Sequence, residues 1–212
     1  YKRQLRKSRQ QNKSAIVKKI VYNVKKNGDK AVIRYEKKFS NIKNKSKKLQ
    51  FSKNEINSIS KTIDKKLKKS IDTAFTRIKY FHSKQTYSAF KYRDKYKNEL
   101  AYKYSPIERV GVYVPGGTAS YPSTVLMNCI PALVAGVKNI YLTTPAFGTA
   151  VNPAVIYAAK KCGVKEIYKT GGAHSIAALA YGTKTFKKVD KIFGPGNAFV
   201  ASAKKEVFGE VG

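Results

Sequence analysis

Three glycine-rich turns are the part of this sequence best suited to bind a ligand: Pro115-Gly116-Gly117, Gly171-Gly172 and Gly194-Pro195-Gly196-Asn197. Each follows a short apolar run and precedes a run typical of a helix. Glycine lets a backbone approach a phosphate closely, and a helix N-terminus favours an anion. One such turn alone is more often a plain connection, but three on one edge favour a nucleotide or phosphate site. None matches G-x-G-x-x-G, so the standard dinucleotide fingerprint is not indicated.

A few polar side chains accompany these turns. Tyr113 ends the apolar run before the first turn, and Thr118 and Ser120 add hydroxyl donors after it. His174 begins the helix after the double glycine, where a ligand contact and a neutral helix residue are equally good interpretations. Asn197 can cap the last helix. These residues are the candidate ligand contacts.

Other reactive residue types show no catalytic arrangement. No pair of carboxylates is placed for acid–base chemistry, and nothing has metal-ligand spacing. His82 lies in a Tyr-Phe-His stretch at a predicted helix end, so we interpret it as structural. Cys129 and Cys162 lie in apolar surroundings, typical of buried free thiols in a reducing compartment. The sequence therefore predicts no catalytic and no metal-binding residue within this chain.

Residues 110–212 alternate strand, turn and helix. Strands are predicted at 110–114, 139–144, 164–170 and 189–193, and helices at 122–135, 152–162, 172–182 and 198–208. Helices that join consecutive short apolar strands indicate a parallel α/β sheet. Right-handed crossovers would bring the strand carboxyl ends, and hence the three turns, to one edge.

Residues 1–109 are predicted to be a separate, mainly helical region. A helix covering residues 16–24 is broken at Asn27-Gly28-Asp29, and Asp29 can cap the next helix. Ser52 and Glu55 form a capping box, followed by one long amphipathic helix to about residue 78. The Tyr- and Lys-rich stretch 87–104 predicts an exposed strand or hairpin.

The net charge is +32, of which +25 falls in residues 1–109. The abundance of Lys together with Asn, Ile, Tyr and Phe favours codon drift over a selected nucleic-acid surface, although that surface is the alternative. No apolar run approaches the roughly 18 residues of a membrane span, and the N-terminus shows no apolar signal region. We expect a cytoplasmic protein with no specific nucleic-acid partner and no membrane contact.

Four ordered blocks of sequence closely resemble histidinol dehydrogenase. They are ERVGVYVPGGT at 108–118, PSTVLM at 122–127, GGAHSIAALAYGT at 171–183 and KVDKIFGPGNAFV at 188–200. The resemblance implies a zinc-dependent homodimer that oxidises L-histidinol to L-histidine in two steps with NAD. It also implies that the sheet of residues 110–212 is an incomplete relative of the Rossmann fold.

Carried over residue by residue, the resemblance makes Tyr113 and Asn197 cofactor contacts, and it places His174 where the family has Gln. Histidine cannot reproduce the paired donor and acceptor of an amide. The family's zinc ligands, substrate-binding Ser and catalytic Glu–His pair all fall beyond the position that matches Gly212. We therefore expect a fragment of the enzyme that is inactive alone. The alternative is a shortened, inactive protein that acts as a basic nucleic-acid-binding or NAD-binding module.

Overall fold

A four-stranded parallel sheet forms the centre of the molecule. The computed structural model describes residues 2–39, 48–116, 121–145 and 151–212. The strands are β3 (Arg109–Tyr113), β4 (Asn139–Thr143), β5 (Glu166–Tyr168) and β6 (Lys191–Phe193), in the order β5-β4-β3-β6. The predicted parallel α/β sheet is confirmed.

Strands β5 and β6 are shorter than predicted because the backbone groups that flank them bond to other parts of the chain. Val164 N–H bonds to the carbonyl of Ala159 at the end of a helix, and Lys169 N–H bonds to Leu49. Val189 N–H bonds to the carbonyl of Leu179, also in a helix. On its outer side, β6 is paired by Gly212, which donates to Asp190 and accepts from Ile192, as in a parallel ladder.

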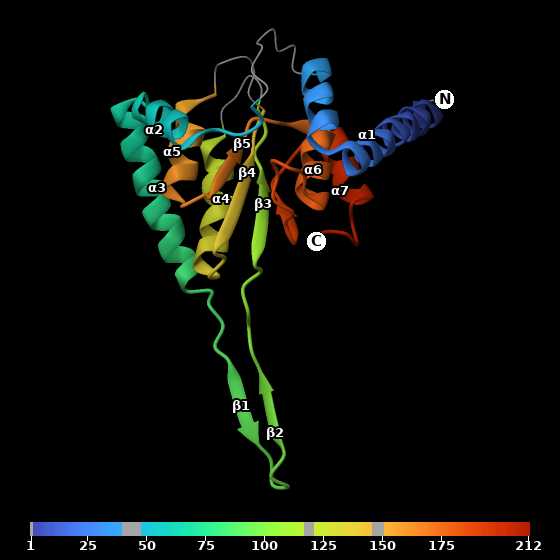
Figure 1. Ribbon diagram of the computed structural model, residues 1–212. Helices are drawn as coiled ribbons and strands as arrows, with labels where there is room; N and C mark the ends of the chain where they lie inside the picture. The colour runs from blue at the N-terminus through green and yellow to red at the C-terminus, as the bar shows by residue number, and fades with distance from the viewer. Residues whose placement is uncertain (1, 40–47, 117–120, 146–150) are drawn as a thin grey trace.

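Helices cover both faces of the sheet (Figure 1). One face packs against α4 (Pro122–Val134) and α5 (Pro153–Lys161), and the other against α6 (Gly172–Tyr181) and α7 (Ala198–Glu206). The alternation along β3 serves both faces: Val110 and Val112 belong to the α4–α5 core, whereas Tyr113 belongs to the α6–α7 core.

The N-terminal helix α1 (Lys2–Phe39) packs on α6 and α7. The predicted break is a kink at Gly28, whose φ of 52° is easily adopted only by glycine. Asp29 was predicted to cap the following helix segment. Instead its carboxylate accepts hydrogen bonds from the hydroxyls of Thr183 and Thr185, in the loop after α6.

The predicted long helix after Ser52 is wrong, because the structure has two helices, α2 (Lys53–Lys61) and α3 (Lys65–Ser83). Asp64 supplies the interruption: its carboxylate accepts from Leu67 N–H at 2.9 Å and so caps α3. The capping box of Ser52 and Glu55 is confirmed. Both helices pack on the α4–α5 side of the sheet.

The stretch 87–104 contains a hairpin, as predicted. Strands β1 (Phe90–Arg93) and β2 (Glu99–Tyr102) pair antiparallel, and every strand residue is exposed. Figure 1 shows the hairpin projecting from the end of the body opposite the strand carboxyl ends. The division of the chain at residue 109 stays a prediction. Among the described helices, none is long and apolar enough to cross a bilayer.

Candidate functional site

Tyr113 connects the glycine turns at the carboxyl edge of the sheet. It ends β3, and only Val114 separates it from Pro115 and Gly116 of the first turn. Its hydroxyl accepts from Gly172 N–H at 3.3 Å, in the second turn. Its backbone carbonyl lies against Gly194, in the third turn. The predicted convergence of the turns is therefore present, with Tyr113 at its centre.

Burial raises the pKa of the Tyr113 hydroxyl above its ordinary value, so the group stays protonated at neutral pH. A protonated phenol that accepts from a backbone N–H keeps its own O–H as a donor. Tyr113 can therefore hold a neighbouring turn and donate to a ligand at the same time.

The third turn is built by close backbone contacts. Gly194 has a φ of 109°, and a Cβ there would overlap the carbonyl oxygen of Tyr113. Lys204 Nζ donates to the Gly194 carbonyl at 2.6 Å. Asn197 caps α7, its Oδ1 accepting from the N–H groups of Phe199 and Val200 at 3.0 and 3.1 Å. Because that oxygen is engaged in the cap, the amide N–H₂ is the group of the exposed Asn197 that could donate to a ligand.

His174 lies in the first turn of α6 and is only 2% exposed. The rings of Tyr35 and Phe39, from α1, lie 6.0 and 6.1 Å from the imidazole. Its Nε2 is 3.3 Å from Oε1 of Glu36, an ion-pair distance without hydrogen-bond alignment. Within the part of the chain that the structure describes, neither ring nitrogen has a hydrogen-bond partner.

Glu36 is the site residue that sequence reasoning missed. It is 4% exposed, and its carboxylate accepts from Gly171 N–H at 2.8 Å. A signal was present, since Glu36 lies four residues after the buried Val32 on the apolar side of α1. A carboxylate in that position calls for a buried partner, but the partner comes from 135 residues further along the chain.

The N-terminus of α6 is therefore occupied by groups of the protein itself. Gly171 N–H points to Glu36 and Gly172 N–H to Tyr113. A phosphate at this turn would meet a buried carboxylate. Both N–H groups of the second turn thus have partners within the protein, and the nucleotide or phosphate site at the three turns stays a prediction. Gly117, Thr118 and Ser120 lie outside the described residues.

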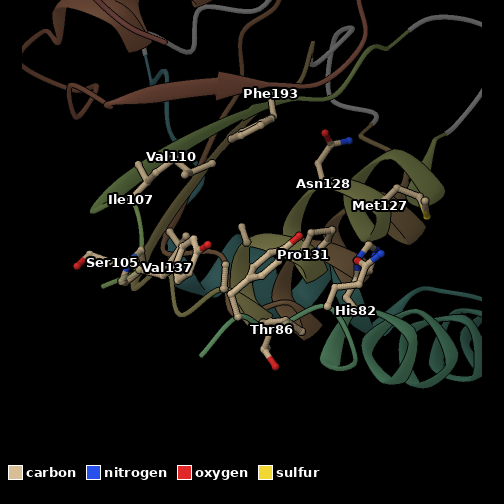
Figure 2. Close-up of a pocket in the computed structure, with 17 residues that line it drawn as sticks. His82, Thr86, Ser105, Ile107, Val110, Met127, Asn128, Pro131, Val137 and Phe193 are labelled. Atoms are coloured by element: carbon tan, nitrogen blue, oxygen red, sulfur yellow. The ribbon is translucent and has the colours of Figure 1, made fainter. Parts of the chain in front are cut away.

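A separate hollow of about 630 Å³ lies at the base of the hairpin (Figure 2). Its walls come from the end of α3, the base of the hairpin, α4 and β6. They include His82, Tyr87, Tyr104, Met127, Asn128 and Phe193. His82 Nδ1 is 2.6 Å from Gln85 Oε1, and the ring meets Phe81 edge-on, which supports a structural role. Neither Tyr113 nor His174 nor Asn197 lines this hollow.

The edge fits a dinucleotide better than it fits a metal. It offers a glycine cradle that any side chain would fill and a protonated phenol. Among the described residues, no group of three or more His, Cys, Asp or Glu side chains could hold a metal ion. Cys129 and Cys162 are buried free thiols, as predicted.

The strand order defines the class of protein: an α/β protein with half of a Rossmann-like sheet. β3, the first strand of this sheet along the chain, lies in the interior of the sheet. β4 and β5 follow on one side of β3, and β6 lies on the other side, so the strand order reverses at β3. The family model described as histidinol dehydrogenase matches residues 3–212. The chain belongs to the histidinol dehydrogenase family, a family of oxidoreductases.

Individual relatives agree with this assignment. The histidinol dehydrogenase of Pelagibacter ubique is 56% identical over 207 residues, which cover 98% of this chain and 47% of the relative. That of Listeria innocua is 48% identical, covering 92% and 45%. The crystal structure of histidinol dehydrogenase from Elizabethkingia anophelis superposes with a TM-score of 0.87 at 38% identity, over 92% of this chain and 45% of that one. The chain thus spans about half the length of the relatives that it matches.

Proposed function

We propose that this chain forms the NAD-binding part of a histidinol dehydrogenase, which oxidises L-histidinol to L-histidine. The observation that carries the proposal is the meeting of the three glycine turns at Tyr113, within a chain that belongs to this family. Bound NAD would supply the hydride acceptor for each of the two oxidations.

Each residue of the edge has a different role in binding the dinucleotide. Tyr113 donates its phenolic proton, and Asn197 donates from its amide while its oxygen caps α7. Gly194 lets the ligand and the turn approach the end of β3 closely. The imidazole of His174 packs against the second turn, since a Cβ on Gly172 would lie 3.6 Å from the His174 ring.

The remaining chemistry needs a metal ion and proton-transfer groups. From the resemblance to histidinol dehydrogenase, we propose that the zinc ligands and the catalytic proton-transfer groups are supplied by residues outside these 212. Homodimer formation and a cytoplasmic location are part of the same proposal.

Two measurements on the purified chain test this proposal. Titration with NADH, followed by its fluorescence, should show saturable binding that weakens by about tenfold in Tyr113→Phe, since one hydrogen bond to the ligand is lost. Histidinol, NAD⁺ and Zn²⁺ together should yield no NADH. Binding that is absent, or indifferent to Tyr113→Phe, would refute the cofactor edge; turnover would show that the catalytic groups lie within this chain.

A basic binding module is the second candidate, favoured by the hairpin. The ring of Phe90 stacks with those of Tyr92 and Tyr102, and β1 also carries Lys91 and Arg93. Base-stacking aromatics with cations are typical of single-strand binding. For the enzyme proposal we expect only weak, sequence-indifferent binding of single-stranded DNA that disappears as salt rises to 0.2 M. Tight binding that survives this salt would favour the module.

A further inference from the structure

We propose that Glu36 is a positioning residue of the cofactor edge: its buried carboxylate fixes the Gly171-Gly172 turn and the imidazole of His174, and so holds the turn against Tyr113. The proposal rests on the proposed function, since the turn matters only if the edge binds a dinucleotide.

The first support is the geometry of the carboxylate. One oxygen, Oε1, lies 2.8 Å from the Gly171 nitrogen and 3.3 Å from His174 Nε2. Both side chains are almost fully covered, with exposed fractions of 6% and 3%. A carboxylate in such surroundings acts strongly on its neighbours, because little water screens it. The carboxylate is thus able to set the position of both the turn and the ring.

The second support is the way the turn is held from several sides. Gly172 N–H donates to the Tyr113 hydroxyl, and a Cβ on Gly171 would overlap the ring of Pro145, at the end of β4. The turn therefore lies between the ends of two strands, and Glu36 is the charged group that holds it from the α1 side. A displacement of the turn would move the Tyr113 hydroxyl, which we assign to the ligand.

The third support is the identity of residue 174. The family resemblance implies Gln there, whereas this chain has His, whose two ring nitrogens are buried without hydrogen-bond partners among the described residues. The Glu36 carboxylate oxygen, 3.3 Å from Nε2, is an acceptor toward which a ring N–H can turn. Glu36 and His174 therefore form one unit, and removing either should affect the site through the other.

The experiment is a double-mutant cycle on the purified protein, with NADH as the probe. Glu36→Leu should weaken NADH binding about tenfold, because a hydrogen bond to a charged group is lost. Glu36→Gln, which keeps an acceptor oxygen for Gly171, should weaken it by only about threefold. His174→Leu should weaken binding in the presence of Glu36 but have little further effect in Glu36→Leu. His174→Gln, which keeps a donor toward Glu36, should have little effect.

A matched control and a second readout separate this role from simple stabilisation. Asp72→Asn removes another paired carboxylate, on the opposite side of the sheet, and should leave the NADH affinity unchanged. Amide exchange of residues 170–175 should speed up in Glu36→Leu and Glu36→Gln without NADH present. A lower melting temperature with unchanged affinity, or independent effects of Glu36 and His174, would overturn the proposal.

The two proposals fail in different ways. If the unmodified protein does not bind NADH, the cofactor function fails, and the exchange of residues 170–175 still decides whether Glu36 holds the turn. If the protein binds NADH and the affinity ignores both Glu36 variants, the function stands and the positioning role is wrong.

Discussion

Gly194 lies at a position where the backbone conformation and the lack of space for a Cβ both require glycine. Its φ of 109° lies in the region favoured by glycine, and the carbonyl of Tyr113 occupies the place of its missing side chain. The two strand ends can approach each other only because this side chain is absent. The nearby Lys204 then fixes the Gly194 carbonyl in that position.

Gly194→Ala should therefore destabilise the protein by at least about 2 kcal/mol, through strain and overlap together. Gly163→Ala is the matched control, since Gly163 also has a positive φ, of 69°, but nothing lies within 4 Å of the added methyl. Urea unfolding measures both. Equal losses would mean that backbone strain alone decides, and that the contact with Tyr113 is unimportant.

The contribution of Tyr157 to the stability of the protein should depend on pH. Its hydroxyl donates to Asp72 at 2.7 Å, and Lys161 lies 2.6 Å from the same carboxylate. Burial and Asp72 raise the pKa of Tyr157 from 10.0 to about 12. Since the folded-state pKa is raised, this contribution to stability is complete below pH 10 and is lost as the pH rises toward 12.

Tyr157→Phe should accordingly be less stable than the unmodified protein at pH 8 and 9, and the difference should shrink between pH 10 and 12. Urea unfolding at each pH measures it, and lysine titration cancels because both proteins share it. Tyr80→Phe, at a position that is 67% exposed, is the control. A difference that stays constant to pH 12 would contradict the assigned bond.

At the scale of elements, Asp29 ties the two halves of the chain together. Its carboxylate lies just after the Gly28 kink and binds the hydroxyls of Thr183 and Thr185, more than 150 residues away. The bond fixes the second segment of α1 over α6, and this segment carries Glu36. The Asn-Gly-Asp sequence thus sets the position of a helix as well as interrupting it.

Asp29→Asn should lower the free energy of unfolding by about 2 kcal/mol, because two hydrogen bonds to a charged group are weakened. Asp94→Asn is the control, since Asp94 binds only within the hairpin turn. We expect no change in its urea midpoint. A neutral Asp29→Asn would show that α1 is held on α6 by apolar packing alone.

The elements also show what sequence could and could not predict. Local signals were sufficient for the capping box at Ser52, the cap at Asn197 and the kink at Gly28, because each depends on a few neighbouring residues. The split between α2 and α3 was missed because the apolar pattern continues across Asp64. The partners of Glu36 and Asp29 were out of reach, since both bonds join residues that only the packing of α1 on α6 brings together.

At the scale of the whole molecule, the two faces of the sheet differ in composition: one is covered by an apolar layer and the other holds the candidate site. The α4–α5 side, with α2 and α3, is a largely apolar layer in which Tyr157 bonds to Asp72. The α1–α6–α7 side holds Tyr113, Glu36 and His174. The candidate site therefore depends on the N-terminal helix, although its glycine motifs all lie after residue 110.

The exposed hairpin has a consequence for how the protein breaks down. Among the described strands, β1 and β2 pair only with each other, and Lys91, Arg93, Lys95, Lys97 and Lys103 lie along the hairpin. A trypsin-like protease would meet these sites before any in the sheet, and a cut there would disturb none of the hydrogen bonds of the β5-β4-β3-β6 ladder. A nicked chain should therefore stay folded, its two pieces held together by the core until a denaturant separates them.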